Sequence, residues 1–217
     1  VAGAESDGIR TFKGIPYAAP PVGPLRWKPP QAPVKWQGVR DATKFGPPCP
    51  SFDTTKYAQA KRRSGLGYDI FSGVPLAPGA TEDCLMLDVW APKAAKNAPV
   101  MVWLNALGAS SNPILDGTAF ARDGVILVNF NYRQLSMGNF SHPALRAAAK
   151  PDEPLGRFQT MDQMAALKWV KDNIRAFGGD PRNVTLFGLS AGGASTLQIL
   201  TIPESKKLVD KAIASGG

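Results

Sequence analysis

The 217-residue sequence predicts an α/β fold with a mostly parallel central sheet and flanking helices. Two short apolar runs, at 100–104 and 125–130, are rich in Val, Ile and Leu, as in strands that are covered on both faces. From residue 160 the apolar positions recur at steps of three and four, which indicates an amphipathic helix. A further strand at 184–187 is followed by a tight turn and a second helical segment. This alternation favours parallel pairing, with a site at the carboxyl ends of the strands.

The N-terminal third of the chain is expected to contain little regular structure. Gly and Pro recur at short intervals through residues 1–50, so we expect extended chain with short edge strands that wraps around the core more than it packs into it. Residues 51–80 are polar and Gly-rich without a clear period, which predicts a long surface loop. The alternation of apolar residues at 85–90 then predicts the first strand of the central sheet.

The helix that starts near residue 160 has recognisable ends. Thr160 and Gln163 have the spacing of a capping box, in which each side chain satisfies a backbone N–H of the first turn. Leu167 and Val170 belong to the apolar series that follows, and the helix is expected to end near Gly178.

Charge and hydropathy exclude two classes of partner. The 25 Lys and Arg against 17 Asp and Glu give a net charge of +8, but the basic residues are scattered, with one dense run at 61–63. Without a basic stripe or a recognisable module, we expect a solvated surface and no nucleic-acid partner. The two longest uncharged stretches, at 97–115 and 183–203, are interrupted by Gly and polar residues, so no membrane span is predicted.

The cysteine inventory consists of Cys49 and Cys84. Counting alone leaves two alternatives open, a disulfide bridge or two buried free thiols.

Gly188, Ser190 and Gly192 form a Gly-x-Ser-x-Gly motif between the predicted strand at 184–187 and the following helix. In such a turn the glycines avoid Cβ clashes, and the serine hydroxyl stands clear of the backbone. The free N–H groups at the start of the helix can then stabilise an oxyanion formed when the hydroxyl attacks a carbonyl. Ser190 is therefore the candidate nucleophile.

Two long segments resemble the active-site signatures of the type-B carboxylesterases, the α/β-hydrolase group that includes cholinesterase-like and bacterial para-nitrobenzyl-type esterases. They are 177–193, Phe-Gly-Gly-Asp-Pro-Arg-Asn-Val-Thr-Leu-Phe-Gly-Leu-Ser-Ala-Gly-Gly, and 82–90, Glu-Asp-Cys-Leu-Met-Leu-Asp-Val-Trp. The resemblance covers nearly the whole chain and implies an α/β-hydrolase fold. Family members are longer, so residues 1–217 are interpreted as the N-terminal part of a single catalytic domain.

The resemblance also implies a disulfide between Cys49 and Cys84, and hence an oxidising compartment, secreted or periplasmic. It implies hydrolysis of small-molecule carboxylic esters without a metal or an organic cofactor. The family's catalytic acid and His lie in a C-terminal half that these residues do not include, so a second chain or segment is expected to supply them. His142 precedes Ser190, which is the wrong order for the triad, and is expected to be structural. Asp162 resembles a family Asp that holds the start of a helix.

The departures from the family cluster around the expected site. Relatives have His-Gly-Gly-Gly-Phe after the strand at 100–104, whereas this chain has Asn-Ala-Leu-Gly-Ala. Asn105 and Ala106 are therefore expected to line an altered pocket. Leu189 stands where relatives carry Glu. The loss of this carboxylate is expected to leave the pocket less hydrated.

The oxyanion donors of the family map onto the backbone N–H groups of Leu107, Gly108 and Ala191. The resulting hypothesis is a serine carboxylesterase that works through an acyl-Ser190 intermediate and has an altered active-site lining. The alternative hypothesis is a catalytically weak or inactive member that keeps the fold for binding.

Overall fold

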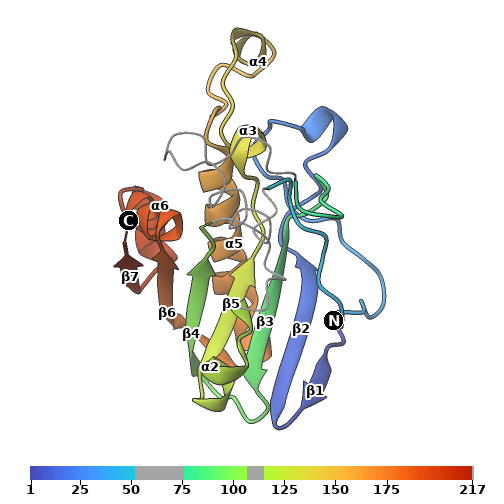
Figure 1. Ribbon diagram of the computed structural model, residues 1–217, viewed down its shortest axis with the longest axis vertical. Helices are drawn as coiled ribbons and strands as arrows, with labels where there is room; N and C mark the ends of the chain where they lie inside the picture. The colour runs from blue at the N-terminus through green and yellow to red at the C-terminus, as the bar shows by residue number, and fades with distance from the viewer. Residues whose placement is uncertain (52–75, 107–114, 217) are drawn as a thin grey trace, which may run out of the picture.

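The computed structural model describes residues 1–51, 76–106 and 115–216. A seven-stranded sheet with strand order β1-β2-β3-β5-β4-β6-β7 forms its centre (Figure 1). The strands are β1 (Ala4–Ser6), β2 (Ile9–Pro16), β3 (Met86–Pro92), β4 (Ala98–Leu104), β5 (Ile126–Phe130), β6 (Gly179–Leu189) and β7 (Lys211–Ser215). The helices are η1 (Gly23–Leu25), α2 (Thr118–Arg122), α3 (Leu135–Gly138), α4 (Pro143–Ala147), α5 (Phe158–Asn173), η3 (Ile174–Phe177), α6 (Ala191–Leu200) and η4 (Pro203–Lys207).

The sheet is mixed. Strands β5, β4, β6 and β7 pair in parallel, which confirms the parallel arrangement predicted for the strands that alternate with helices. Strands β1, β2 and β3 extend the sheet from β5 through antiparallel pairs. In the parallel half, Leu104 at the end of β4 is in register with Gly188 near the end of β6. The carboxyl ends of these two strands therefore meet at one edge of the sheet.

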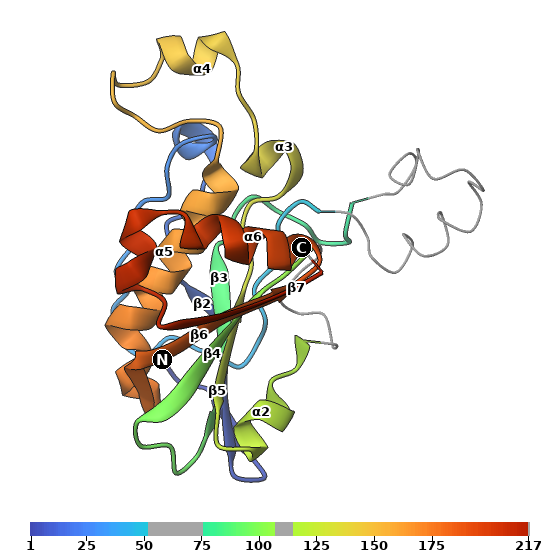
Figure 2. The same cartoon turned by 90° about the vertical axis from the view of Figure 1, so that its left-hand side faces the viewer.

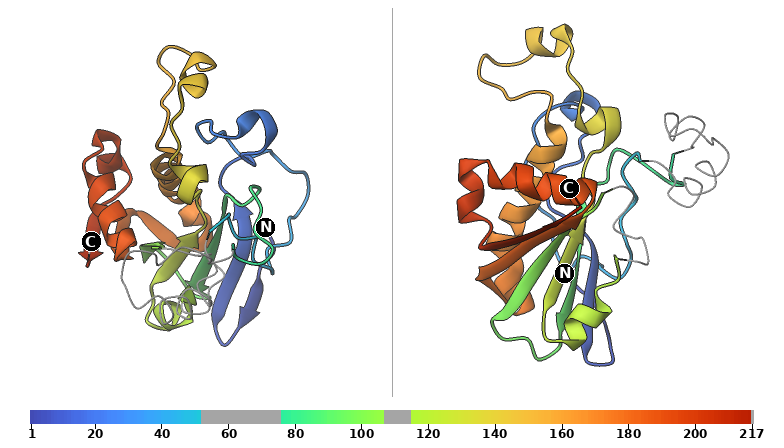
Figure 3. Two further views of the ribbon diagram at one scale, coloured as in Figure 1. Left: turned by 45° about the horizontal axis from the view of Figure 1, so that its top comes forward. Right: turned by 60° about the vertical axis from the view of Figure 1, so that its left-hand side comes forward.

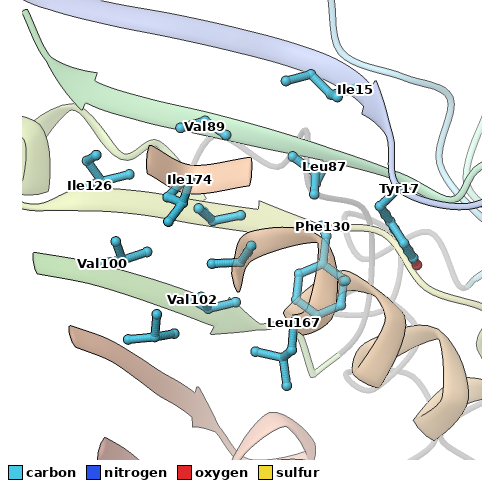
Figure 4. Close-up of a cluster of buried hydrophobic side chains, with 14 of the residues drawn as sticks. Ile15, Tyr17, Leu87, Val89, Val100, Val102, Ile126, Phe130, Leu167 and Ile174 are labelled. Carbon is cyan, nitrogen blue, oxygen red and sulfur yellow. The ribbon is translucent and has the colours of Figure 1, made fainter. Parts of the chain in front are cut away.

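Helices cover the two faces of the sheet unequally (Figures 2 and 3). The long helix α5 and helix α6 pack on one face, and the short helix α2 packs on the other. Strand β4 shows how the sequence builds this arrangement, because its side chains alternate between the two faces. Val100 and Val102 are fully buried in the main core with Leu167 of α5, as Figure 4 shows. Met101 and Trp103 pack on the opposite face against the smaller cluster around Trp90.

Helix α5 begins two residues before the predicted capping box. Arg157 is its N-cap residue and makes no side-chain capping bond. Thr160 and Gln163 lie inside the helix and are buried, so the capping prediction is wrong. The two side chains face the interior, where they cannot fold back on the first turn. The predicted end is confirmed, because Gly178 follows η3 with a φ of 92°.

The N-terminal segment packs more closely than the sequence suggested. Within the described part of residues 1–50, β1 is a short edge strand, whereas β2 pairs with both β1 and β3. Ile15 and Tyr17 belong to the main core. Gly14, with a φ of 65°, lies at the irregularity between Phe12 and Ile15, so the Gly and Pro that indicated wrapping chain instead accommodate a bulged interior strand.

The predicted disulfide is confirmed: Cys49 and Cys84 are bonded, with their Cα atoms 5.0 Å apart. In the part of the chain that the structure describes, no helix is both long and apolar enough to cross a bilayer. Several sequence predictions lie outside the described residues, namely most of the loop at 51–80, the basic run at 61–63, and Leu107 and Gly108.

Candidate active site

Ser190 occupies the sharp turn between β6 and α6, as its motif predicts. Its φ of 56° and ψ of −125° lie in a sparsely populated region for a residue with a Cβ atom. Two backbone hydrogen bonds hold this conformation: the Ser190 N–H donates to the Ser215 carbonyl over 2.8 Å, and the Ala194 N–H donates to the Ser190 carbonyl over 3.0 Å. Such strain persists where the surroundings over-determine it, and it concentrates at functional sites.

The glycines around Ser190 are required by close approaches of the backbone. A Cβ atom at Gly188 would collide with the carbonyl oxygen of Gly192, and one at Gly192 would collide with the carbonyl oxygen of Leu104. A Cβ atom at Gly193 would lie 2.7 Å from the Ser215 carbonyl oxygen. The first turn of α6 therefore packs directly on the ends of β4, β6 and β7. Sequence reasoning missed the roles of Gly193 and Ser215, although the second glycine of the Gly-Gly pair was a usable signal.

The turn exposes the serine hydroxyl and the start of a helix. Ser190 and Ala191 are exposed, whereas Gly192 and Gly193 are buried beneath them. The first N–H groups of a helix have no partner within it, and they carry the positive end of the helix dipole. Ala191 is the first residue of the ten-residue helix α6 and directly follows Ser190, so its N–H is one of these groups.

The exit of β4 lies against the same turn. A Cβ atom at Gly192 would be 3.4 Å from the carbonyl carbon of Asn105, so these backbones are in contact. Asn105 is buried, and its Nδ2 donates to the Phe130 carbonyl over 3.2 Å. Its Oδ1 has no hydrogen-bond partner among the described residues. Ala106, half-buried, is the last described residue before the segment that contains Leu107 and Gly108.

Leu189, directly before Ser190, is 53% exposed. It is one of the residues that line an apolar cavity of about 200 Å³ on the α2 face of the sheet. The other lining residues are Trp103, Leu115, Asp116, Phe120, Leu127 and Phe187. A Glu at position 189 would place a carboxylate beside this hydrocarbon surface, and the Leu removes that charge.

Asp162 has a different role from the helix-start function that the sequence suggested. Its carboxylate accepts hydrogen bonds from the Arg133 guanidinium at 2.7 and 2.8 Å, and from the Arg133 backbone N–H at 3.1 Å. The Arg133 side chain is 1% exposed and the Asp162 side chain is 0% exposed. Burial raises the pKa of Asp162, and the hydrogen bonds and positive charge of Arg133 oppose that rise. This pair ties the segment after β5 to the second turn of α5.

His142 is structural, as its position in the sequence suggested. It is the N-cap residue of α4, and its Nδ1 accepts a hydrogen bond from the Ala144 N–H over 3.1 Å. Its ring stacks on Phe140. Helix α4 projects beyond the end of the sheet, apart from the turn between β6 and α6 in every view (Figures 1, 2 and 3).

Within the described ranges, no group of three or more His, Cys, Asp or Glu side chains is placed to hold a metal ion.

Comparison with known proteins places this geometry in a family. Residues 1–217 match the model of the carboxylesterase family. The chain belongs to this family. Carboxylesterase-family relatives include the fumonisin B1 esterase of Sphingopyxis macrogoltabida, which is 42% identical over 98% of this chain. The para-nitrobenzyl esterase of Bacillus subtilis is 44% identical over 100% of it, and the cholinesterase of Mus musculus is 39% identical over 96%.

Solved structures of this family share the fold. Two PNB esterases, one of them thermophilic, match with a TM-score of 0.81 each, at 40% and 39% sequence identity, and cover 98% of this chain. The α/β-hydrolase fold expected from the sequence is thereby confirmed. The chain spans 37%, 42% and 33% of the lengths of the three relatives named above, and 41% and 42% of the two solved chains.

Proposed function

We propose that this chain carries the nucleophile of a serine carboxylesterase that hydrolyses small-molecule carboxylic esters through an acyl-Ser190 intermediate. The observation that carries the proposal is the backbone of Ser190, with a φ of 56° in a turn whose flanking glycines admit no Cβ atom. Membership of the carboxylesterase family supports the same chemistry. A turn built only to reverse the chain would need neither the strain nor an exposed hydroxyl at its apex.

The reaction follows from the groups at the turn. The Ser190 Oγ attacks the ester carbonyl carbon while its proton passes to a general base, and the carbonyl oxygen becomes an oxyanion. The Ala191 N–H, with the N–H groups of Leu107 and Gly108 proposed as further donors, stabilises that oxyanion. Collapse of the tetrahedral intermediate expels the alcohol, which takes up the proton. Water then attacks the acyl-Ser190 carbonyl by the same route and releases the carboxylic acid. No step needs a metal or an organic cofactor.

The general base and its orienting acid come from outside these 217 residues. His142 caps α4 apart from the turn, so it is not placed to accept the Ser190 proton. We therefore propose that the C-terminal remainder of the same catalytic domain, as a second chain or segment, supplies a histidine and a carboxylate. The bonded Cys49 and Cys84 support a secreted or periplasmic location, where disulfides persist.

Labelling by an activated-serine reagent tests the proposal. The protein with the segment that supplies the base is treated with a fluorophosphonate, and intact-mass spectrometry then measures adducts on each chain. We expect one adduct on this chain, located at Ser190 by peptide mapping and absent from Ser190→Ala. Labelling that persists in Ser190→Ala, or none in a sample that contains the complete domain, would refute the assignment.

A second candidate, a weak or inactive esterase fold used for binding, is favoured by one observation. Leu189 is exposed beside Ser190, at a position where the resemblance to the family leads us to expect Glu, and Leu107 stands where the resemblance leads us to expect a glycine of the oxyanion loop. Restoring both positions with Leu107→Gly and Leu189→Glu separates the two candidates. A large gain in hydrolysis of simple esters from a nearly inactive parent supports the binding protein. An already active parent that gains nothing supports an esterase adapted to another substrate.

A further inference from the structure

The hydroxyl of Tyr132 lies beneath the active-site turn, and no step of the proposed reaction uses it. Tyr132 follows β5 and is 1% exposed. Its ring packs against Phe130, with ring centroids 5.9 Å apart. The hydroxyl donates a hydrogen bond to the backbone carbonyl of Asn105, the first residue after β4. A buried phenol hydroxyl normally needs a hydrogen-bond partner. The partner of the Tyr132 hydroxyl is the backbone of Asn105, which contacts the turn that carries Ser190.

The contact continues from Asn105 to the start of α6. The Asn105 carbonyl group that accepts from Tyr132 lies against Gly192, two residues after the nucleophile. A second hydrogen bond, from the Asn105 side chain to the Phe130 carbonyl, holds the same residue to the end of β5. The backbone at the exit of β4 is therefore held between β5 and the first turn of α6, where the carbonyl oxygen of Leu104 leaves no space for a Cβ atom at Gly192 and the Asn105 carbonyl carbon lies next to it.

We propose that Tyr132 is a positioning residue for the Ser190 site: by holding the Asn105 backbone against Gly192, its hydroxyl sets where the Ala191 N–H lies relative to the Ser190 hydroxyl. The inference rests on the proposed function for its effect on catalysis, while the positioning itself is a property of the fold. Tyr132 touches neither the substrate nor the nucleophile, and it acts through Asn105 and Gly192.

The chemistry of the hydroxyl suits this role. Burial raises the pKa of Tyr132 well above its ordinary value, and the side chain of Gln163 only partly opposes that rise. The phenol therefore stays protonated and remains a donor wherever the protein is folded. In Tyr132→Phe the ring keeps its packing, but the Asn105 carbonyl loses its donor in an apolar interior.

The chain offers a matched control in Tyr17. Its hydroxyl is also buried, and it donates to the backbone carbonyl of Asn131 over 2.6 Å. Burial raises the pKa of Tyr17 as well. Tyr17→Phe therefore removes the same kind of hydrogen bond from the same core, but one whose acceptor directly follows β5 rather than lying at the exit of β4. A purely structural role for Tyr132 predicts that the two variants behave alike.

The catalytic test uses a pair of organophosphate inhibitors that differ only in having a P=O or a P=S group, with the protein in its complete form. Sulfur is a weak acceptor, so the ratio of the two rates of Ser190 phosphorylation measures how well the oxyanion donors are placed. Complete removal of one such donor costs about 100-fold to 1,000-fold in rate. We expect displacement in Tyr132→Phe to lower the P=O to P=S ratio by about tenfold, while Tyr17→Phe leaves it unchanged. Equal ratios in the parent and both variants would overturn the proposal.

Amide hydrogen exchange keeps the positioning claim independent of the proposed function. If the parent reacts with neither inhibitor, the serine esterase assignment fails. Amide exchange in the peptide around Ser190 and Gly192 then tests by itself whether Tyr132 positions the start of α6. We expect faster exchange there in Tyr132→Phe than in Tyr17→Phe, because the start of α6 loses its support from the β4 exit. Equal exchange in the two variants would contradict a positioning role for Tyr132, whatever the enzyme does.

Discussion

The buried pair of Arg133 and Asp162 makes a quantitative prediction about stability. Replacing Arg133 by Met keeps an unbranched apolar chain in the site but removes both side-chain hydrogen bonds, at 2.7 and 2.8 Å, from the Asp162 carboxylate. Because the carboxylate is 0% exposed, water cannot replace them. Removing one partner of such a buried pair costs about 3–5 kcal/mol in the free energy of unfolding.

The exposed pair of Lys168 and Asp172 is the matched control. Its nitrogen and oxygen lie 2.8 Å apart, but the side chains are 69% and 55% exposed. Lys168→Met should therefore cost less than about 0.5 kcal/mol. Urea denaturation followed by circular dichroism gives both free energies. Equal losses in Lys168→Met and Arg133→Met would refute the argument that burial, rather than the distance between the charges, sets the cost.

The free energy of unfolding that Arg133→Met loses should also depend on pH. Burial raises the pKa of Asp162 in the folded protein above its unfolded value, so its contribution to stability falls as the pH rises through the folded pKa. Arg133 opposes that shift, and Arg133→Met removes the opposition, so the pKa of Asp162 rises further in the variant. The stability gap between parent and variant should be widest near neutral pH and narrow as the pH approaches the ordinary carboxyl range near about 4. A gap that stays constant over this range would contradict the explanation.

Three further changes test other parts of the structure. Gly192→Ala forces a Cβ atom into the Leu104 carbonyl, so it should lower the free energy of unfolding in urea by about 3 kcal/mol or more and abolish fluorophosphonate labelling. Gly124→Ala, at a φ of 82° with no neighbour within 4 Å, should cost only about 1–2 kcal/mol and leave labelling intact. Replacing Cys49 and Cys84 together by Ala opens a 35-residue separation and should lower the free energy of unfolding by about 4 kcal/mol, an effect that a reducing agent reproduces in the parent. His142→Ala removes the cap of α4 and should leave labelling unchanged, and a loss of labelling would identify it as the base.

Features encoded by neighbouring residues could be predicted from the sequence. The turn at Ser190 depends on glycines within a few positions of it, and β4, β5 and β6 of the parallel half each contain an apolar run that predicted the strand. Strand β7, whose residues are exposed, has no such run. The helix end at Gly178 is equally local, because a left-handed residue terminates the helix directly. The disulfide needed the resemblance to a family, because two cysteines 35 positions apart carry no local signal of pairing.

Contacts between distant residues could not be predicted in this way. The spacing of Thr160 and Gln163 fits a capping box, but both side chains are buried in the interior of α5, where tertiary packing overrides the local pattern. Asp162 meets Arg133 across 29 positions, and the Tyr132 hydroxyl meets Asn105 across 27. Nothing near any of these residues in the chain specifies its partner, because the partner is selected when β5, α5 and β4 come together.

The hydrogen bond from the Ser190 amide to the Ser215 carbonyl has a consequence for biosynthesis. Strand β7, which supplies that carbonyl, pairs with β6 and follows it in the chain, so a ribosome releases the serine some twenty-five residues before the strand that constrains it. Until β7 has emerged and docked, the hydrogen bond to Ser215 is missing and does not hold Ser190 at its φ of 56°. The strained turn at Ser190 is therefore expected to form only once β7 is available, after the other six described strands have been synthesised.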